Sequence, residues 1–147
     1  MEFSMHPIGV IRSPFTDSAH TPIQAARSEA IGHIEVYPEY AEGLLDIDEL
    51  SHLILLYVFH RSLQYTLMVK PFLDDQLHGL FATRYPARPN PIGLSIVRLV
   101  ERDNCILTVE GVDMLDGTPL LDIKPYIPEF DIREGVHAGW YEHRSKP

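Results

Sequence analysis

Apolar and polar residues alternate along several stretches of the chain, which predicts β-strands. In residues 32–37, Ile34 and Val36 fall on one face and polar or aromatic side chains fall on the other, the period of a half-buried strand. Residues 53–59 are apolar without interruption, so we expect a strand that is buried on both faces. The same reasoning places further strands at residues 8–12, 79–83, 94–100, 105–114 and 119–125.

Helical patterns are few and short, and the connections between strands are long. Pro38 suits the first position of a helix, so we expect a helical turn or two over residues 38–46 and another over residues 47–50. Residues 15–30 follow neither period. We expect them to form a functional loop, the alternative being a disordered connection.

Turn signals separate the later strands. They occur at residues 102–104 and at Asp116-Gly117, where glycine accepts a positive φ. The pattern therefore predicts a mainly β fold, a single-domain antiparallel or mixed β-barrel with a few short helices and long loops, because closing a barrel removes exposed strand edges. Beyond residue 127 the signals fade, and we expect Trp140 and Tyr141 to dock the tail onto the barrel or onto a partner subunit.

The composition fits one globular domain over residues 1–147, long enough to bury a core. The hydrophobic fraction of 45% is ordinary for such a protein. Cys105 is the only cysteine, which excludes an internal disulfide and favours the reducing cytoplasm. The sequence shows no signal peptide, and its longest apolar run is too short to cross a bilayer, so no membrane association is expected.

The net charge of −9 bears on the possible partners of the protein. Contacts with nucleic-acid phosphates normally favour a basic surface, and this chain is acidic overall. Arg84, Arg88, Arg98 and Arg102 nevertheless cluster within 19 residues. The sequence therefore indicates either a focused contact with RNA or a smaller substrate.

The most unusual stretch is rich in proline and runs from residue 84 to residue 91. Pro86, Pro89 and Pro91 fix φ and push the residues before them into extended backbone. The result is a stiff loop that presents Arg84, Arg88 and Asn90 with little entropy left to lose on binding. A plain surface connection is the alternative, but the interleaved arginines and asparagine favour a binding loop.

Two common kinds of site do not fit the sequence. His52, His60 and His78 match no compact ligand spacing, and there is no second cysteine, so no metal site is expected. The nine glycines never occur two apart, which excludes the Gly-x-Gly-x-x-Gly fingerprint of a Rossmann cofactor site.

The stretches 81–84, 88–95 and 113–126 resemble the signature of the TsaA-like (TrmO-type) family, with weaker similarity at residues 8–14 and 59–61. This resemblance implies a β-barrel methyltransferase that uses S-adenosylmethionine. It implies methylation at N6 of threonylcarbamoyl-adenosine, next to the anticodon of tRNA, by a homodimer. Longer bacterial members carry an additional C-terminal domain, whereas this sequence stops at Pro147, which places the RNA substrate in question more than the cofactor.

The resemblance also implies a cofactor pocket. An arginine, Arg61 or Arg84, suits the cofactor carboxylate, and Asp116 or Gln24 suits the ribose hydroxyls. Leu94 and the turn at residues 115–118 are expected to border the adenine ring of the cofactor. Spacing alone favours a plain hairpin turn at Asp116-Gly117, and only the resemblance favours a contact with the cofactor. The full set implied by the resemblance is Pro22, Ile23, Gln24, His60, Arg61, Arg84, Leu94, Leu115, Asp116, Gly117 and Thr118.

Two residues of the proline-rich loop are candidates for catalysis. Methyl transfer is an in-line displacement that depends mainly on placement of the reacting atoms. Asn90, held between two prolines, is expected to accept a hydrogen bond from the target amine and localise its lone pair. Arg88 is expected to hold the threonylcarbamoyl carboxylate or a phosphate. Tyr126 is either a base-stacking residue or a core tyrosine.

Three functions remain open at this point. The first is methylation of tRNA adenosine, and the second is S-adenosylmethionine-dependent methylation of a small molecule or protein. The third is a cofactor-binding module without turnover, in which Asn90 only stiffens the loop.

Overall fold

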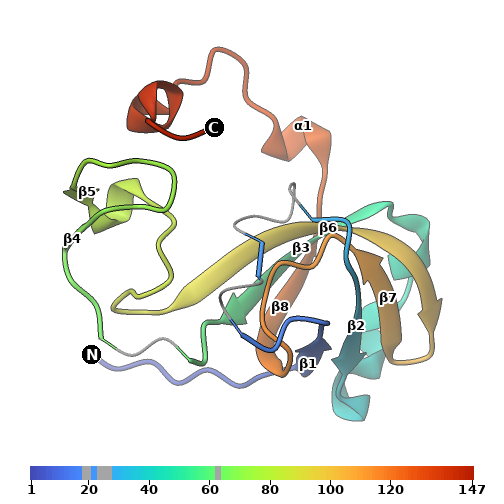
Figure 1. Cartoon of the computed structure of the whole chain (residues 1–147). Coiled ribbons are helices and arrows are strands. Elements are labelled where there is room, and N and C mark those ends of the chain that lie inside the picture. Colours follow the sequence, from blue (N-terminus) through green and yellow to red (C-terminus); the bar gives the residue numbers. More distant parts are fainter. Residues whose placement is uncertain (18–20, 23–27, 62–63) are drawn as a thin grey trace. The chain divides into compact units, whose positions relative to one another are not determined.

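The computed structural model describes residues 1–17, 21–22, 28–61 and 64–147 (Figure 1). They form two compact units. The barrel unit comprises residues 1–60 and 92–126, and the loop unit comprises residues 61–91 and 127–147. The single domain expected from the sequence stays a prediction.

The barrel unit is a closed barrel of six strands in the order β1-β2-β7-β6-β3-β8, with every neighbouring pair antiparallel. This confirms the predicted mainly β barrel. The barrel strands are visible in Figure 1. They are β1 (Gly9–Arg12), β2 (Ile31–Val36), β3 (His52–Val58), β6 (Ile92–Asp103), β7 (Ile106–Glu110) and β8 (Thr118–Pro125).

Alternation along the strands builds the barrel core. On β2, Ile34 and Val36 are buried as predicted, and Ile34 is fully enclosed. Each enclosed aliphatic side chain of this kind stabilises the fold by about 1.5–3 kcal/mol. The core residues exposed by 1% or less are Ile11, Ile34, Leu53, Leu55, Val97, Leu107, Val109, Val112 and Leu120.

The strand β3 corrects one expectation. Its inward residues Leu53, Leu55 and Tyr57 are buried, but the residues between them are only half-buried. The prediction of burial on both faces is therefore wrong, because only one face of each strand in a closed barrel meets the interior.

Two predicted strands are shorter in the structure. The strand expected at residues 79–83 ends as β5 (His78–Gly79) and gives way to the 3-10 helix η5 (Leu80–Ala82). The strand expected at residues 105–114 stops with β7, because Gly111 has a φ of +102° and leaves the extended conformation.

One turn is displaced and two helices are as predicted. The turn expected at residues 102–104 lies at Asn104, whose φ is +55°, because β6 continues to Asp103. The 3-10 helices η3 (Pro38–Leu44) and η4 (Ile47–Glu49) match the predicted helical turns. Within the described ranges, no helix has the length and apolar character needed to cross a membrane.

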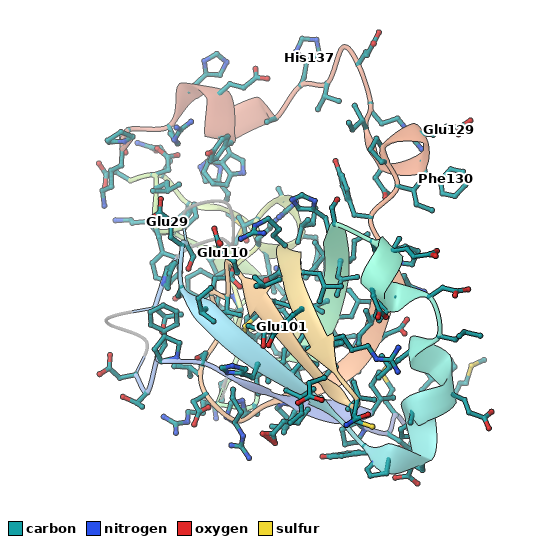
Figure 2. The ribbon with its side chains drawn as sticks, turned by 90° about the vertical axis from the view of Figure 1, so that its right-hand side faces the viewer. Glu29, Glu101, Glu110, Glu129, Phe130 and His137 are labelled. Atoms are coloured by element: carbon teal, nitrogen blue, oxygen red, sulfur yellow. The ribbon has the colours of Figure 1, made fainter. Side chains whose placement is uncertain are left out.

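The loop unit consists of short elements joined by irregular backbone. Strand β4 (Met68–Val69) pairs with β5, and the C-terminal part holds the helix α1 (Pro128–Asp131) and the 3-10 helix η6 (Gly139–His143). On α1, the side chains of Glu129 and Phe130 point away from the ribbon (Figure 2).

Trp140 makes two contacts within the loop unit, and its docking on the barrel or on a partner subunit stays a prediction. Its indole stacks on His78 with a centroid distance of 4.7 Å and an interplanar angle of 21°. Its Nε1–H donates a hydrogen bond of 2.7 Å to the carbonyl of Ala82.

A buried carboxylate lies beside this stack. Asp74 is 6% exposed, and its Oδ2 lies 2.6 Å from His78 Nε2. Its Oδ1 accepts a hydrogen bond of 3.1 Å from the backbone N–H of Ser145. The hydrogen bond with His78, supported by the Ser145 amide, outweighs the effect of burial and lowers the pKa of Asp74 to about 2.

Asp74 makes the stability of the protein depend on acid pH. Because its pKa is lower in the folded chain than the ordinary 3.8, the ionised carboxylate stabilises the fold above about pH 4, and this contribution is lost as the pH falls toward 2. We expect the difference in free energy of unfolding between wild type and Asp74→Asn, measured by urea denaturation, to shrink as the pH falls from about 4 toward 2. A difference that stays constant down to pH 2 would contradict this assignment.

Candidate functional site

The predicted Asp-Gly turn is present in the barrel unit, at the start of β8. The backbone N–H of Thr118 donates to the carbonyl of Leu115 at 3.3 Å, and its hydroxyl donates to the same oxygen at 2.5 Å. Gly117, in the third position of the turn, has a φ of +82°, which side chains other than glycine or asparagine rarely adopt.

This turn is fastened to the end of β1. The N–H groups of Gly117 and Asp116 donate to the carbonyls of Ile11 and Phe15 at 2.9 and 2.8 Å. Asp116 Oδ1 accepts a hydrogen bond of 3.1 Å from the N–H of Ser13, and Oδ2 lies 4.0 Å from Arg12 Nη1. The N–H groups of Asp116, Gly117 and Thr118 therefore already donate hydrogen bonds within the chain. The groups that remain for a ligand are the side chains and carbonyl oxygens of the turn.

A buried chain of hydrogen bonds connects the proline-rich block to the Asp-Gly block. The side chains of Tyr57, Ser95 and Asp113 are 3%, 2% and 8% exposed. Ser95 Oγ lies 2.7 Å from the Tyr57 hydroxyl and 2.5 Å from Asp113 Oδ1. Because a carboxylate only accepts, Ser95 donates to Asp113 and Tyr57 donates to Ser95.

Gly93 makes room for this chain of hydrogen bonds. It faces Tyr57 across the pair of strands β6 and β3, and a Cβ at Gly93 would lie 2.3 Å from the Tyr57 ring. Sequence analysis missed Tyr57, Ser95 and Asp113 as a group. The available signal was a hydroxyl at an inward position of β6, between Gly93 and Val97.

The other predicted residues of the barrel unit belong to other segments of the chain. Leu94 is on the outer face of β6, 43% exposed, and faces Leu56 of β3. His60 is exposed just beyond the end of β3, and Pro22 is half-buried. Ile23 and Gln24 lie outside the described residues.

A surface cavity of about 370 Å³ lies on the outside of the barrel unit, next to the Leu94 position. Leu56, the cross-strand neighbour of Leu94, contributes to its wall. None of the residues predicted from the sequence lines the cavity, whose walls are Met5, His6, Leu56, Ile92, Leu121 and Asp122.

In the loop unit, Arg88 braces the proline-rich loop. Its Nη1 donates to the carbonyls of Thr83 and Tyr85, both at 2.9 Å, and its guanidinium lies 5.9 Å from the Phe81 ring. Tyr85 also stacks on Phe72 with a centroid distance of 5.4 Å. These contacts restrain the loop, whose stiffness stays a prediction, and Arg88 is half-buried against the loop rather than extended into solvent.

Asn90 lies exposed between Pro89 and Pro91. Its side chain forms no hydrogen bond with any residue that the structure describes, so its amide is available to a ligand. Arg61 and Arg84 are also exposed in this unit.

The predicted concentration of positive charge is smaller than expected. Arg98 of β6 faces Glu110 of β7 across the sheet, and the two side chains form an ion pair of 2.5 Å. Arg102 pairs with Asp48 at 3.2 Å. Glu101 and Glu110 add negative charge to the barrel wall (Figure 2).

The three histidines considered for a metal site have different surroundings. His78 pairs with Asp74, whereas His52 bonds to Ser51 Oγ at 2.8 Å and His60 is exposed. In the described part of the chain, no group of three or more His, Cys, Asp or Glu side chains is placed to hold a metal ion.

Comparison with known proteins gives the family. A family model described as the tRNA-methyltransferase O N-terminal domain matches residues 10–132. The chain belongs to this family. The match includes both blocks that carry the resemblance, residues 88–95 and 113–126.

Individual relatives agree with this assignment. A protein of Pyrococcus abyssi named "probable S-adenosyl-L-methionine-binding protein" is 59% identical over 137 residues, which are 92% of this chain and 74% of that protein. A mouse protein named "tRNA (adenine(37)-N6)-methyltransferase" is 39% identical, and the matched region covers 95% of this chain but 34% of the mouse protein. The crystal structure of TrmO from Pseudomonas aeruginosa matches with a TM-score of 0.82 and 38% identity, covering 100% of this chain and 65% of that chain. The chain therefore spans about two thirds of the length of this solved relative and a smaller part of the mouse protein.

The chain of buried hydrogen bonds predicts a graded effect of substitution. Ser95→Ala removes both hydrogen bonds of the serine hydroxyl and is expected to cost about 2–3 kcal/mol, because a buried carboxylate and a buried phenol each lose a partner. Tyr57→Phe removes one neutral bond and leaves the bond to Asp113, so we expect about 1 kcal/mol. Urea denaturation measures both. A Ser95→Ala variant no less stable than Tyr57→Phe would show that Asp113 does not depend on Ser95.

Proposed function

We propose that this protein is an S-adenosylmethionine-dependent methyltransferase that methylates N6 of adenosine in tRNA, specifically the threonylcarbamoyl-adenosine next to the anticodon. The observation that carries the proposal is the family match over residues 10–132, which spans the Asp-Gly turn and Asn90. Relatives named for S-adenosylmethionine binding and for tRNA adenine methylation support the same activity.

The chemistry of the exposed groups suits this cofactor. The apolar outer face of β6 at Leu94 suits the adenine, and Asp116 Oδ2 is an acceptor for ribose hydroxyls. The exposed guanidinium of Arg61 or Arg84 suits the cofactor carboxylate. We assign cofactor binding to these residues together with Leu115, Gly117, Thr118, His60 and the Pro22-Ile23-Gln24 segment.

The chain's own residues contribute placement rather than acid–base catalysis. When bound, S-adenosylmethionine supplies an activated methyl group. The side-chain oxygen of Asn90 accepts a hydrogen bond from the target amine and turns its lone pair out of the ring system. Because Asn90 is fixed between two prolines, little entropy is lost when the amine binds. The donors of Arg88 other than Nη1 hold the threonylcarbamoyl carboxylate or a phosphate.

A second candidate is methylation of a substrate other than tRNA. The net charge of −9 and the pairing of Arg98 and Arg102 with acidic residues favour it. For either substrate we propose a homodimer that works in a reducing cytoplasm. Light scattering after gel filtration of the full chain would test the dimer, and a monomer mass would exclude it.

Transfer of a labelled methyl group separates these functions. The full chain is incubated with labelled S-adenosylmethionine and tRNA that carries threonylcarbamoyl-adenosine, and the nucleosides are analysed. We expect label in the modified adenosine and none in tRNA that lacks the threonylcarbamoyl group. Label only in other molecules of an extract would favour the second candidate, and cofactor binding without transfer to any acceptor would refute both.

Substitution of Asn90 tests its catalytic role. Asn90→Ala is expected to lower kcat by about 10²-fold while the Kd for S-adenosylmethionine changes less than about twofold, because the amide acts on the target amine. Gln76→Ala removes another exposed amide of the loop unit and is the control, with kcat unchanged. If Asn90→Ala weakens cofactor binding as much as turnover, the residue serves the loop rather than the reaction.

A further inference from the structure

The last residues of the chain are fastened to the segment that leads into the proline-rich loop. We call residues 139–146 the tail. Ser145 N–H donates to Asp74 Oδ1 and Lys146 N–H donates to the carbonyl of Leu73, both at 3.1 Å. Trp140 Nε1–H donates to the carbonyl of Ala82 at 2.7 Å. These three hydrogen bonds and the stacked ring of His78 all lie within the loop unit.

The Trp140 contact meets the loop at its root. Ala82 directly precedes Thr83, which is buried and whose hydroxyl donates to the carbonyl of Leu80 at 2.7 Å and accepts from the N–H of Tyr85 at 3.2 Å. The carbonyl of Thr83 in turn accepts from Arg88 at 2.9 Å. A continuous series of contacts therefore runs from Trp140 through Ala82 and Thr83 to Arg88, two residues before Asn90.

His78 and Asp74 hold the indole in the orientation that this hydrogen bond needs. Asp74 fixes one edge of the imidazole through the bond to Nε2, so the ring lies nearly parallel to the indole. The same Asp74 carboxylate accepts a hydrogen bond from the Ser145 N–H, so it holds both the His78 imidazole and the tail. Trp140 therefore makes two directional contacts, the hydrogen bond to Ala82 and the stacking on His78. Packing of an exposed tail would require neither.

We propose that the tail is a strap that sets the position of the proline-rich loop, and that Trp140 is its positioning residue. The strap restricts Ala82 and Thr83, so Arg88 and Asn90 project from a fixed backbone. The effect on turnover rests on the proposed function, since it acts through Arg88 and Asn90. The restraint of the loop backbone does not rest on the proposed function.

Hydrogen exchange of the full-length chain tests the strap without reference to activity. Trp140→Phe keeps a ring on His78 but removes the donor to Ala82. We expect amides in residues 80–91 to exchange about 3- to 10-fold faster, the range for loss of one hydrogen bond. Trp140→Ala also removes the stacking and is expected to raise exchange further. His143→Ala, an exposed substitution on the same 3-10 helix, is the control and should leave the rate unchanged. Unchanged exchange in both Trp140 variants would overturn the proposal.

Turnover then tests what the strap is for. In the wild-type background, Trp140→Phe is expected to lower kcat about 3- to 10-fold with little change in the Kd for S-adenosylmethionine. In the Asn90→Ala background the same substitution should have a smaller effect on kcat, because the part of its influence that passes through Asn90 is already lost and only the part through Arg88 remains. A general loss of stability would instead lower kcat equally in both backgrounds, and that result would overturn the positioning role. Absence of methyl transfer by the wild type would refute the proposed function and leave the exchange result to decide the strap.

Discussion

The hydrogen bond from Ser95 to Asp113 is the interaction on which the barrel end depends. A buried carboxylate is costly unless it is hydrogen-bonded, so β6 must present a donor at this position and the chain after β7 must bring Asp113 to it. Gly93 follows from the same constraint, because only a residue without Cβ lets the Tyr57 ring approach closely enough for its hydroxyl to reach Ser95. The turn at Asp116 and Gly117 begins three residues after Asp113, so the bond to Ser95 anchors the chain just before the turn.

Both candidate binding elements are restrained by contacts within their own unit, for different reasons. In the barrel unit, the Asp-Gly turn is held by hydrogen bonds to Ile11, Ser13 and Phe15. In the loop unit, three prolines limit the backbone and Arg88 ties the loop to its own carbonyls. A protein that aligns reacting groups without strong acid–base chemistry benefits from such preorganisation, since the entropy of ordering is already lost in folding.

Local patterns in the sequence predict the barrel and its turn, because alternation and a positive φ depend on neighbouring residues. Ile34 and Val36 face the core, and Gly117 has the backbone that its turn needs. Interactions between distant residues were not predictable. The pairing of Arg98 with Glu110 depends on the register of two strands, and the contact of Ser95 with Asp113 depends on barrel closure. Leu80–Ala82 illustrates a third limit, since a short apolar run fits a strand and a 3-10 helix equally well.

The central proposal is that Leu94 and the turn at residues 115–118 both contact S-adenosylmethionine, and that the Ser95–Asp113 hydrogen bond holds the backbone next to each of them. Titration of the isotope-labelled full-length chain with this cofactor, followed by amide NMR, measures it directly. The account predicts saturable shifts at residues 93–95 and 113–118 in the wild type, and much weaker binding by Ser95→Ala under conditions where that variant is folded. Saturable binding that leaves both stretches unshifted, or equal affinity in the folded variant, would contradict it.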